Sequence, residues 1–100
     1  MKKPIKIWID DMRPAPKGYC WCQDAETAFR VIDYYTHYKV EIVEISFDHD
    51  LGEELSGYDI AKYIVEYQIP IGGFKVHSAN PVGRFNIEQL LTHYGYKKII

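Results

Sequence analysis

The sequence predicts an open α/β fold in which a five-stranded, mostly parallel sheet carries helices on both faces. Short β-branched and aromatic runs alternate with longer segments of helical periodicity, and the connections between them are short. The chain has 100 residues, of which 47% are hydrophobic and 26% are charged, as in an average globular domain. No repeat, linker or low-complexity tract divides it, so we expect a single domain over residues 1–100.

The first two strands are expected at residues 5–9 and 19–22. The first is a β-branched and aromatic run that leads directly into two aspartates. Two prolines and a glycine within residues 13–18 prevent a helix there and predict a surface loop. In the second strand, Cys20 and Cys22 point to the same face. Because the chain has no second cysteine pair, we interpret them as small apolar side chains rather than as a redox or metal pair.

Three helices follow from capping residues and apolar periodicity. The first begins after the N-cap residue Asp24 and is expected to end near Tyr38. The second begins with the capping-box pattern Ser-Gly-Tyr-Asp at residues 56–59 and is closed by a proline and two glycines. The third begins at Asn80, which is followed by a proline at the first helical position, and Gly95 ends it.

Three further strands complete the predicted sheet, at residues 41–47, 74–77 and 96–100. Residues 41–47 are apolar at most positions, which suits a central strand covered on both faces. The predicted order is therefore strand, strand, helix, strand, helix, strand, helix, strand. Right-handed crossovers between parallel strands would place the helices against the sheet.

Charge and hydropathy exclude several classes of partner. No apolar run approaches the ~18 residues of a membrane span, and the N-terminus lacks a long apolar segment and a small-residue cleavage site. We therefore expect a cytoplasmic protein with no membrane partner. A net charge of −2 and a pI near 6.0 give no basic footprint for duplex DNA. A phosphate-containing small molecule remains an expected partner, and a short nucleic-acid end could still be bound locally by a metal ion and a few donors. The aromatic helix faces leave a homodimer open, although a packed core explains most of them.

Acidic residues follow two of the predicted strands. Asp10 and Asp11 follow the first, and Asp48 and Asp50 follow the central one. In an open parallel sheet, ligands bind at the carboxyl ends of the strands, and converging carboxylates suit a hard cation. Alternatively, these aspartates cap loops and helices, and Asp50 is the weakest member because Asp-Leu-Gly is also an ordinary turn. We predict a divalent metal site, with Mg²⁺ or Mn²⁺ as the expected cofactor.

Two histidines, His49 and His77, are the only ones predicted outside helices, and both lie in polar clusters at strand ends. The ordinary pKa of imidazole suits proton transfer near neutral pH, so either is a candidate general acid or base. The alternative for each is a histidine that simply hydrogen-bonds a neighbour.

Residues 77–86 outline an anion site. They place a helix N-terminus, capped by Asn80, directly after a strand, with Arg84 one turn into the helix. A well-capped helix with a solvated arginine would explain the same residues. Arg13 is a second candidate phosphate contact, and it could equally pair with one of the aspartates before it.

At these positions the sequence resembles a response-regulator receiver domain. The matching residues are the acidic pair Asp10 and Asp11, Asp48 at the phosphoacceptor position, Gly57 at the start of the next helix, and the pair Ser78 and Ala79. The resemblance implies a flavodoxin-like fold and places Ser78 in the phosphate-binding site. There are three departures from the receiver pattern: an Arg-Pro-x-Pro-x-Gly loop in place of the first helix, no Lys-Pro after the last strand, and an end at Ile100 before a final helix. We therefore expect a shortened fold with degenerate or missing first and last helices.

Three motifs resemble a narrower family, the cyclic-phosphate processing receiver domains: Trp-Ile-Asp-Asp-Met-Arg-Pro, Ser-Phe-Asp-His-Asp-Leu-Gly and His-Ser-Ala-Asn-Pro-Val-Gly-Arg-Phe-Asn-Ile. This resemblance implies a phosphoesterase, a hydrolase acting on cyclic nucleotides or on RNA ends with 2′,3′-cyclic phosphates. In the mechanism that we expect, a metal ion held by the aspartates activates water, and His49 or His77 transfers a proton. A covalent phosphate on Asp48 is a variant.

Two other functions are open at this point. The first is a receiver-like binding module without chemistry, which would recognise a phosphorylated or cyclic nucleotide or a partner protein. The second is a true phosphoacceptor domain, which the missing lysine makes the least expected.

Overall fold

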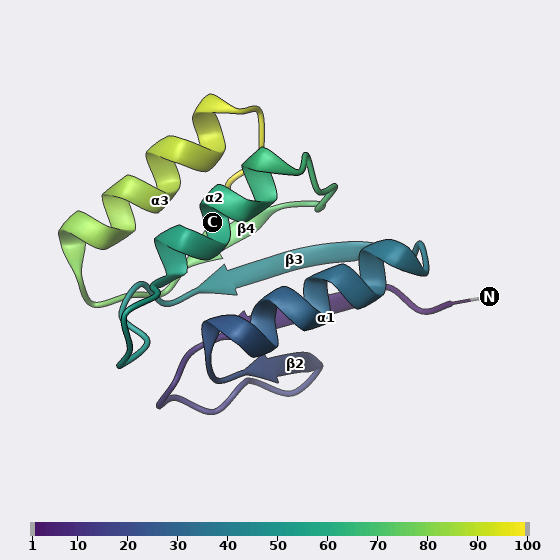
Figure 1. Ribbon diagram of the computed structural model, residues 1–100, viewed down its shortest axis with the longest axis horizontal. Coiled ribbons are helices and arrows are strands. Elements are labelled where there is room, and N and C mark those ends of the chain that lie inside the picture. The colour runs from purple at the N-terminus through teal and green to yellow at the C-terminus, as the bar shows by residue number, and fades with distance from the viewer. Residues whose placement is uncertain (1, 100) are drawn as a thin grey trace.

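The computed structural model describes residues 2–99, and it contains four strands and three helices (Figure 1). In chain order these are β1 (Ile5–Ile9), β2 (Tyr19–Cys22), α1 (Ala25–His37), β3 (Ile42–Phe47), α2 (Gly57–Glu66), β4 (Phe74–Val76) and α3 (Pro81–His93). None of the helices in this part of the chain has the length and apolar character needed to span a bilayer.

The four strands form one parallel sheet in the order β2-β1-β3-β4. The register sets Ile9 level with Cys22 on one side and with Phe47 on the other, and Phe47 is level with Val76. Because the strands end level with one another, the residues that follow them meet at one edge of the sheet. The prediction of a parallel α/β fold is confirmed.

The fifth strand predicted at residues 96–100 is not formed in the described part of the chain. Lys98 makes a single parallel bridge to Phe74, supported by two backbone hydrogen bonds of 2.9 and 2.7 Å. The reason is the length of β4, which has three residues before the chain turns toward α3 and so offers little edge for pairing. Ile100 lies outside the described residues.

All three helices pack on one face of the sheet, whereas the sequence predicted helices on both. From β2 onward, every connection moves across the sheet in the same direction, and right-handed crossovers of one direction leave their helices on one face. The connection that moves the other way, from β1 to β2, is a loop without a helix, as predicted. In Figure 1, α1 and α2 both lie in front of the strands, and α2 packs against α1 and α3.

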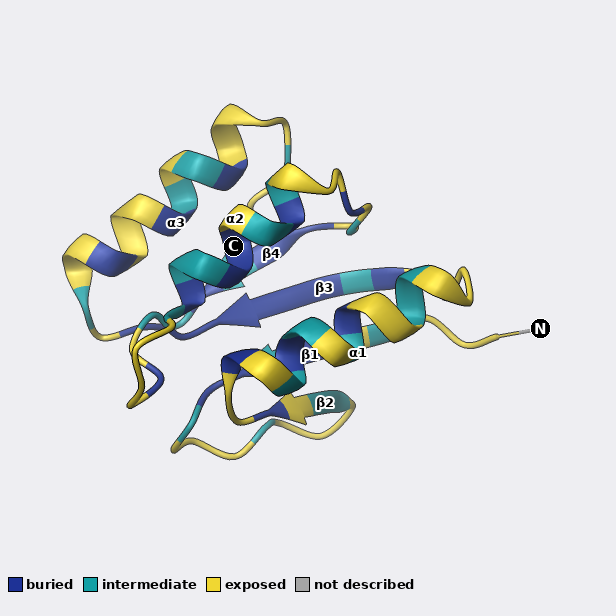
Figure 2. Cartoon of the chain, viewed as in Figure 1, coloured by how far each residue is buried: buried dark blue, intermediate teal, exposed yellow. Residues whose placement is uncertain are grey.

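The hydrophobic core lies between this face and the helices. The central strand β3 is buried along most of its length, as the dark blue arrow in Figure 2 shows. Ile7, Ile9, Ile45 and Phe47 are fully buried in the core cluster that the strands share with the helices. The helices contribute small and branched residues to the same cluster, namely Ala25, Ala28, Ile32, Ile60, Ala61, Ile64, Ile87 and Leu91. Cys22 joins this core and Cys20 is half-buried beside it, so the prediction of apolar packing cysteines is confirmed.

The opposite face, called the open face below, is polar and aromatic. The strand register places on it Lys6, Trp8, Tyr19, Trp21, Glu44, Ser46 and Lys75. Glu44 is buried there at 5% exposure, where it accepts a hydrogen bond from the Tyr19 hydroxyl and pairs with Lys75 Nζ at 3.3 Å. Glu44 thus has both a hydrogen-bond donor and a cation as partners, so its carboxylate can be buried on a sheet face that no described helix covers.

The helix starts are those that the capping residues predict. The Asp24 carboxylate accepts a hydrogen bond from the Thr27 amide at 2.7 Å, and the Asn80 side-chain oxygen accepts one from the Gly83 amide at 3.0 Å. At α2, Ser56 and its N3 residue form a complete capping box. The helix α1 ends at His37 with Tyr38 as its C-cap, as expected.

Candidate metal and phosphate site

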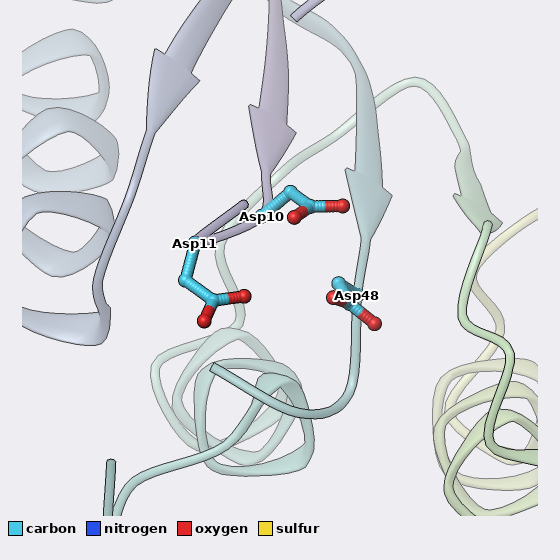
Figure 3. A group of neighbouring side chains, drawn as sticks. All are labelled: Asp10, Asp11 and Asp48. Atoms are coloured by element: carbon cyan, nitrogen blue, oxygen red, sulfur yellow. The ribbon is translucent and has the colours of Figure 1, made fainter. Parts of the chain in front are cut away.

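Three aspartates meet at the carboxyl edge of the sheet. Asp10 and Asp11 follow β1, Asp48 follows β3, and Figure 3 shows their carboxylates turned toward a common space. One oxygen from each lies within 4.8 Å of the others. The backbone fixes this placement, because the Asp48 amide donates to the Ile9 carbonyl at 2.8 Å. Three of the four aspartates predicted as metal ligands are therefore brought together.

Asp10 is fully buried and held by several donors. Its Oδ1 accepts hydrogen bonds from the amides of Met12 and Arg13, both at 2.8 Å, and its Oδ2 lies 3.0 Å from His77 Nε2. Burial alone would raise the pKa of Asp10, but these hydrogen bonds outweigh burial and lower the pKa below its usual value. The carboxylate is therefore ionised at neutral pH despite its burial.

Arg13 is the cation nearest to this group. Its Nε lies 2.9 Å from Asp10 Oδ2 and its Nη2 lies 3.7 Å from Asp48 Oδ2, while half of the side chain stays exposed. The sequence allowed Arg13 to pair with Asp10 or with Asp11, and in the structure it pairs with Asp10. Three carboxylates against one guanidinium leave a formal charge of −2, which matches a divalent cation. The oxygen spacing also suits such an ion, whose ligands lie at most about 4–5 Å apart across it.

The loop after β3 approaches Asp11 closely. At Gly52 the backbone has a φ of +68°, and a Cβ atom there would lie 2.8 Å from Asp11 Oδ2. Farther along the loop, Glu53 Oε2 accepts a hydrogen bond of 2.9 Å from the amide of Ala25, the first residue of α1. The loop is thus tied to the helix on one side and leaves room for Asp11 on the other.

His77 lies on the open face beside the aspartates. Its ring stacks on Trp8, its Nδ1 lies 2.8 Å from Ser46 Oγ and its Nε2 lies 3.0 Å from Asp10. Burial lowers the pKa of His77, against the opposing effect of Asp10, so the ring is neutral at neutral pH. A neutral ring that donates from Nε2 to Asp10 must accept from the Ser46 hydroxyl at Nδ1. Both ring nitrogens are therefore engaged.

His49, Asp50 and Asn80 form a second group, at the start of α3. His49 Nδ1 lies 3.0 Å from Asp50 Oδ1, and Asn80 Nδ2 lies 3.2 Å from Asp50 Oδ2. These hydrogen bonds, with His49 first, lower the pKa of Asp50. Asp50 is not among the three clustered aspartates, and its carboxylate is occupied by His49 and Asn80 instead. Its predicted metal role is not supported by this geometry.

Two glycines allow close packing around His49. A Cβ atom on Gly57 would lie 2.1 Å from the backbone oxygen of Asp48, and the Gly57 amide donates to the His49 carbonyl at 2.8 Å. A Cβ atom on Gly83 would lie 2.3 Å from the imidazole of His49. A side chain at Gly57 would therefore collide with the backbone of Asp48, whereas one at Gly83 would collide with the His49 side chain.

The remaining predicted phosphate contacts are not directed at the aspartates. Arg84 Nε lies 3.2 Å from Glu88 Oε2 within α3, so its guanidinium is held along the helix. Ser78 is buried, and its hydroxyl accepts from the Asn80 amide at 3.1 Å. Asn80 itself caps α3. Arg13 is therefore the predicted phosphate contact that the fold brings to the carboxylates.

The sequence matches the family described as the cyclic-phosphate processing receiver domain over residues 5–93, a range that includes the seven helices and strands of the described chain. The chain belongs to this family. Neither the curated proteins nor the solved structures searched contain a match.

As a cyclic-phosphate processing receiver domain, the chain has the receiver arrangement of strands in shortened form. The match includes the three clustered aspartates and His77. The contribution of Trp8 and Ser46 to the placement of His77 was not predicted from the sequence. Glu44 and Ser46 are polar at alternating positions of a strand that is otherwise apolar, a pattern that could have indicated a polar sheet face.

Proposed function

We propose that this receiver domain is a divalent-metal-dependent phosphoesterase that opens cyclic phosphates. The observation that carries the proposal is the cluster of Asp10, Asp11 and Asp48, whose oxygens lie within 4.8 Å of one another beside Arg13. The match to a family of cyclic-phosphate processing domains supports the substrate class. The reaction adds water across one phosphorus–oxygen bond of the ring, so a phosphodiester becomes a phosphomonoester and a free hydroxyl.

The three aspartates would hold the ion, with Mg²⁺ or Mn²⁺ as the expected metal. Their oxygen donors and their residual charge of −2 with Arg13 fit a hard divalent cation. When bound, such an ion polarises phosphoryl oxygens and lowers the pKa of water. Asp10 is less available than the other two carboxylates, because two amides, Arg13 and His77 already occupy its oxygens.

The remaining roles are assigned by exposure and hydrogen bonding. Arg13 is half-exposed and carries further donors on its guanidinium, so it can bind a phosphate oxygen while it stays near Asp10. His77 is engaged at both nitrogens, which gives it the role of positioning Asp10. His49 donates to Asp50 through Nδ1, so we assign proton transfer to its other ring nitrogen, Nε2.

A binding module without chemistry is the second candidate. It is favoured by the engagement of both nitrogens of His77, because the histidine that contacts the clustered aspartates then has no nitrogen free for proton transfer. His49, the other candidate histidine, is hydrogen-bonded to Asp50, outside the three clustered aspartates. In that case the aspartates would hold a metal ion that contacts the phosphate, and Arg13 would bind a phosphate oxygen directly.

The deciding experiment is incubation of the purified protein with Mg²⁺ or Mn²⁺ and a short RNA that ends in a 2′,3′-cyclic phosphate. Cyclic mononucleotides and dinucleotides are tested in parallel, and product is followed by chromatography. Asp48→Asn is the inactive control. Product from the wild type and none from Asp48→Asn supports the phosphoesterase. Metal-dependent binding without product supports the binding module, and neither binding nor product contradicts both.

A further inference from the structure

An exposed tryptophan lies directly beside the candidate site. Trp21 is on the edge strand β2, level with Trp8, and its side chain lies on the open face. Its Nε1 donates a hydrogen bond of 2.7 Å to the backbone oxygen of Asp10. The indole is thus attached to the residue whose carboxylate belongs to the acidic cluster.

This indole is both accessible and fixed. Trp21 is 37% exposed, and the described residues place no helix over the open face. Its hydrogen bond to Asp10 defines the position of the ring before any ligand binds, so little conformational entropy would be lost on binding. The indole is therefore held next to Asp10, with a part of its surface open to a ligand.

The groups around Asp10 match the parts of a nucleotide. A nucleotide carries an aromatic base and an anionic phosphate that are separated by one ribose. The site offers an exposed indole, the half-exposed guanidinium of Arg13 and the acidic cluster, all connected through Asp10. Indole rings bind bases by stacking, and they do so with little dependence on base identity.

We infer that Trp21 stacks on the nucleobase next to the bound phosphate, which makes the domain selective for nucleotides over base-free sugar phosphates. The inference rests on the proposed function, since it takes the acidic cluster and Arg13 as the phosphate-binding part. The other exposed aromatic residues of the described chain lie on helices, as Tyr34 and Phe85 do, or at helix C-caps, and none has a hydrogen bond to Asp10.

The test compares two ligands that the enzyme does not turn over. These are adenosine 3′-monophosphate and methyl riboside 3-monophosphate, both products of opening a cyclic phosphate. They share the ribose phosphate, but the first carries adenine where the second carries only a methoxy group. Their dissociation constants are measured by calorimetry with Mg²⁺ for the wild type, Trp21→Ala, Trp21→Phe and the control Tyr34→Ala. Stacking of one base contributes about 5- to 140-fold in affinity, so the wild type should prefer the nucleotide by this factor.

Trp21→Ala should bring this preference close to one and leave the affinity for the methyl riboside phosphate unchanged. Trp21→Phe and Tyr34→Ala should keep most of the preference. If Trp21→Ala does not fold, Trp21→Leu is used, because it keeps apolar volume on the strand and lacks a ring.

Three results would overturn the inference. The first is equal binding of the two ligands by the wild type, and the second is an unchanged preference in Trp21→Ala or Trp21→Leu. Either would leave the proposed function standing if cleavage is observed. The third is that the wild type binds neither ligand and cleaves no cyclic phosphate, which would remove the proposed function as well.

Discussion

The imidazole of His77 lies flat on the indole of Trp8, with ring centroids 3.8 Å apart and an angle of 4° between the planes. The stack fixes the direction of both ring nitrogens, so that one reaches Asp10 and the other reaches Ser46. The indole is fixed in turn by a hydrogen bond of 2.9 Å from its Nε1 to the Arg13 carbonyl. A chain of contacts therefore runs from the open face to the acidic cluster.

The first prediction concerns metal binding. Mn²⁺ or Mg²⁺ at about 100 times its dissociation constant should stabilise the wild type by about 2–3 kcal/mol, a shift of several degrees in Tm. Asp11→Asn and Asp48→Asn should lose most of this shift, because each removes one of the clustered carboxylates. Differential scanning fluorimetry measures it, with Glu26→Gln on the exposed side of α1 as control. Equal shifts in all four proteins would contradict the metal site.

The second prediction concerns His77 as a positioning residue. His77→Ala should weaken metal binding by about 10- to 100-fold, because it removes a hydrogen bond that orients Asp10. Ser46→Ala should also weaken metal binding, by a smaller factor, because Ser46 contacts His77 rather than Asp10. His37→Ala is the control, because His37 is an exposed residue at the C-terminal end of α1. Calorimetric titration with Mn²⁺ measures the affinities. Lost turnover with unchanged metal affinity would instead make His77 the proton-transfer group.

The third prediction compares two glycines near the site. Gly57→Ala should lower the free energy of unfolding by at least about 2 kcal/mol and impair the site, because its Cβ would overlap the Asp48 backbone. Gly83→Ala should have a smaller effect, since it meets the His49 side chain, which can rotate away. Urea denaturation of both variants measures this. A larger loss of stability in Gly83→Ala would contradict this account.

The fourth prediction is a pH dependence of stability from Asp59. The Ser56 amide lowers the pKa of this carboxylate in the folded state, although burial opposes the effect. A lowered pKa stabilises the fold above the unfolded value of about 4, and this contribution is lost as pH falls through the folded pKa. Asp59→Asn should therefore cost about 1 kcal/mol at pH 7 and progressively less below about pH 4.

Urea denaturation of Asp59→Asn between pH 7 and pH 3 tests this dependence. Glu66→Gln, at the exposed end of the same helix, is the control. A cost for Asp59→Asn that stays constant over this range would rule out the titration of Asp59 as the cause.

The fifth prediction concerns the cysteines. Burial raises the pKa of Cys22 to about 12, and the side chain is fully buried, so its thiol should not react in the folded protein. Cys20 is half-buried and should react slowly with a thiol reagent. In Cys20→Ser, labelling should appear only when denaturant is added. Rapid labelling of folded Cys20→Ser would show that Cys22 is accessible.

Much of the fold could be predicted because its signals are local. The capping residues Asp24, Ser56 and Asn80 mark the three helix starts that the structure contains. The positions of the aspartates were predictable for a related reason, since the carboxyl ends of parallel strands meet at one edge. The fifth strand could not be judged in this way, because its formation depends on the length of β4, where its partner would lie.

The sequence by itself determined the number of helices, the parallel sheet and the strand ends at which the aspartates lie, because periodicity and capping act between neighbours along the chain. Only the tertiary structure decided which of these groups meet. In the folded chain Arg13 pairs with Asp10, Asp50 contacts His49, and the ring of His77 stacks on Trp8. The tertiary structure also left one sheet face open beside Trp21. Such contacts depend on side-chain directions and on the handedness of the connections between strands, which residues distant in sequence settle only when they pack together.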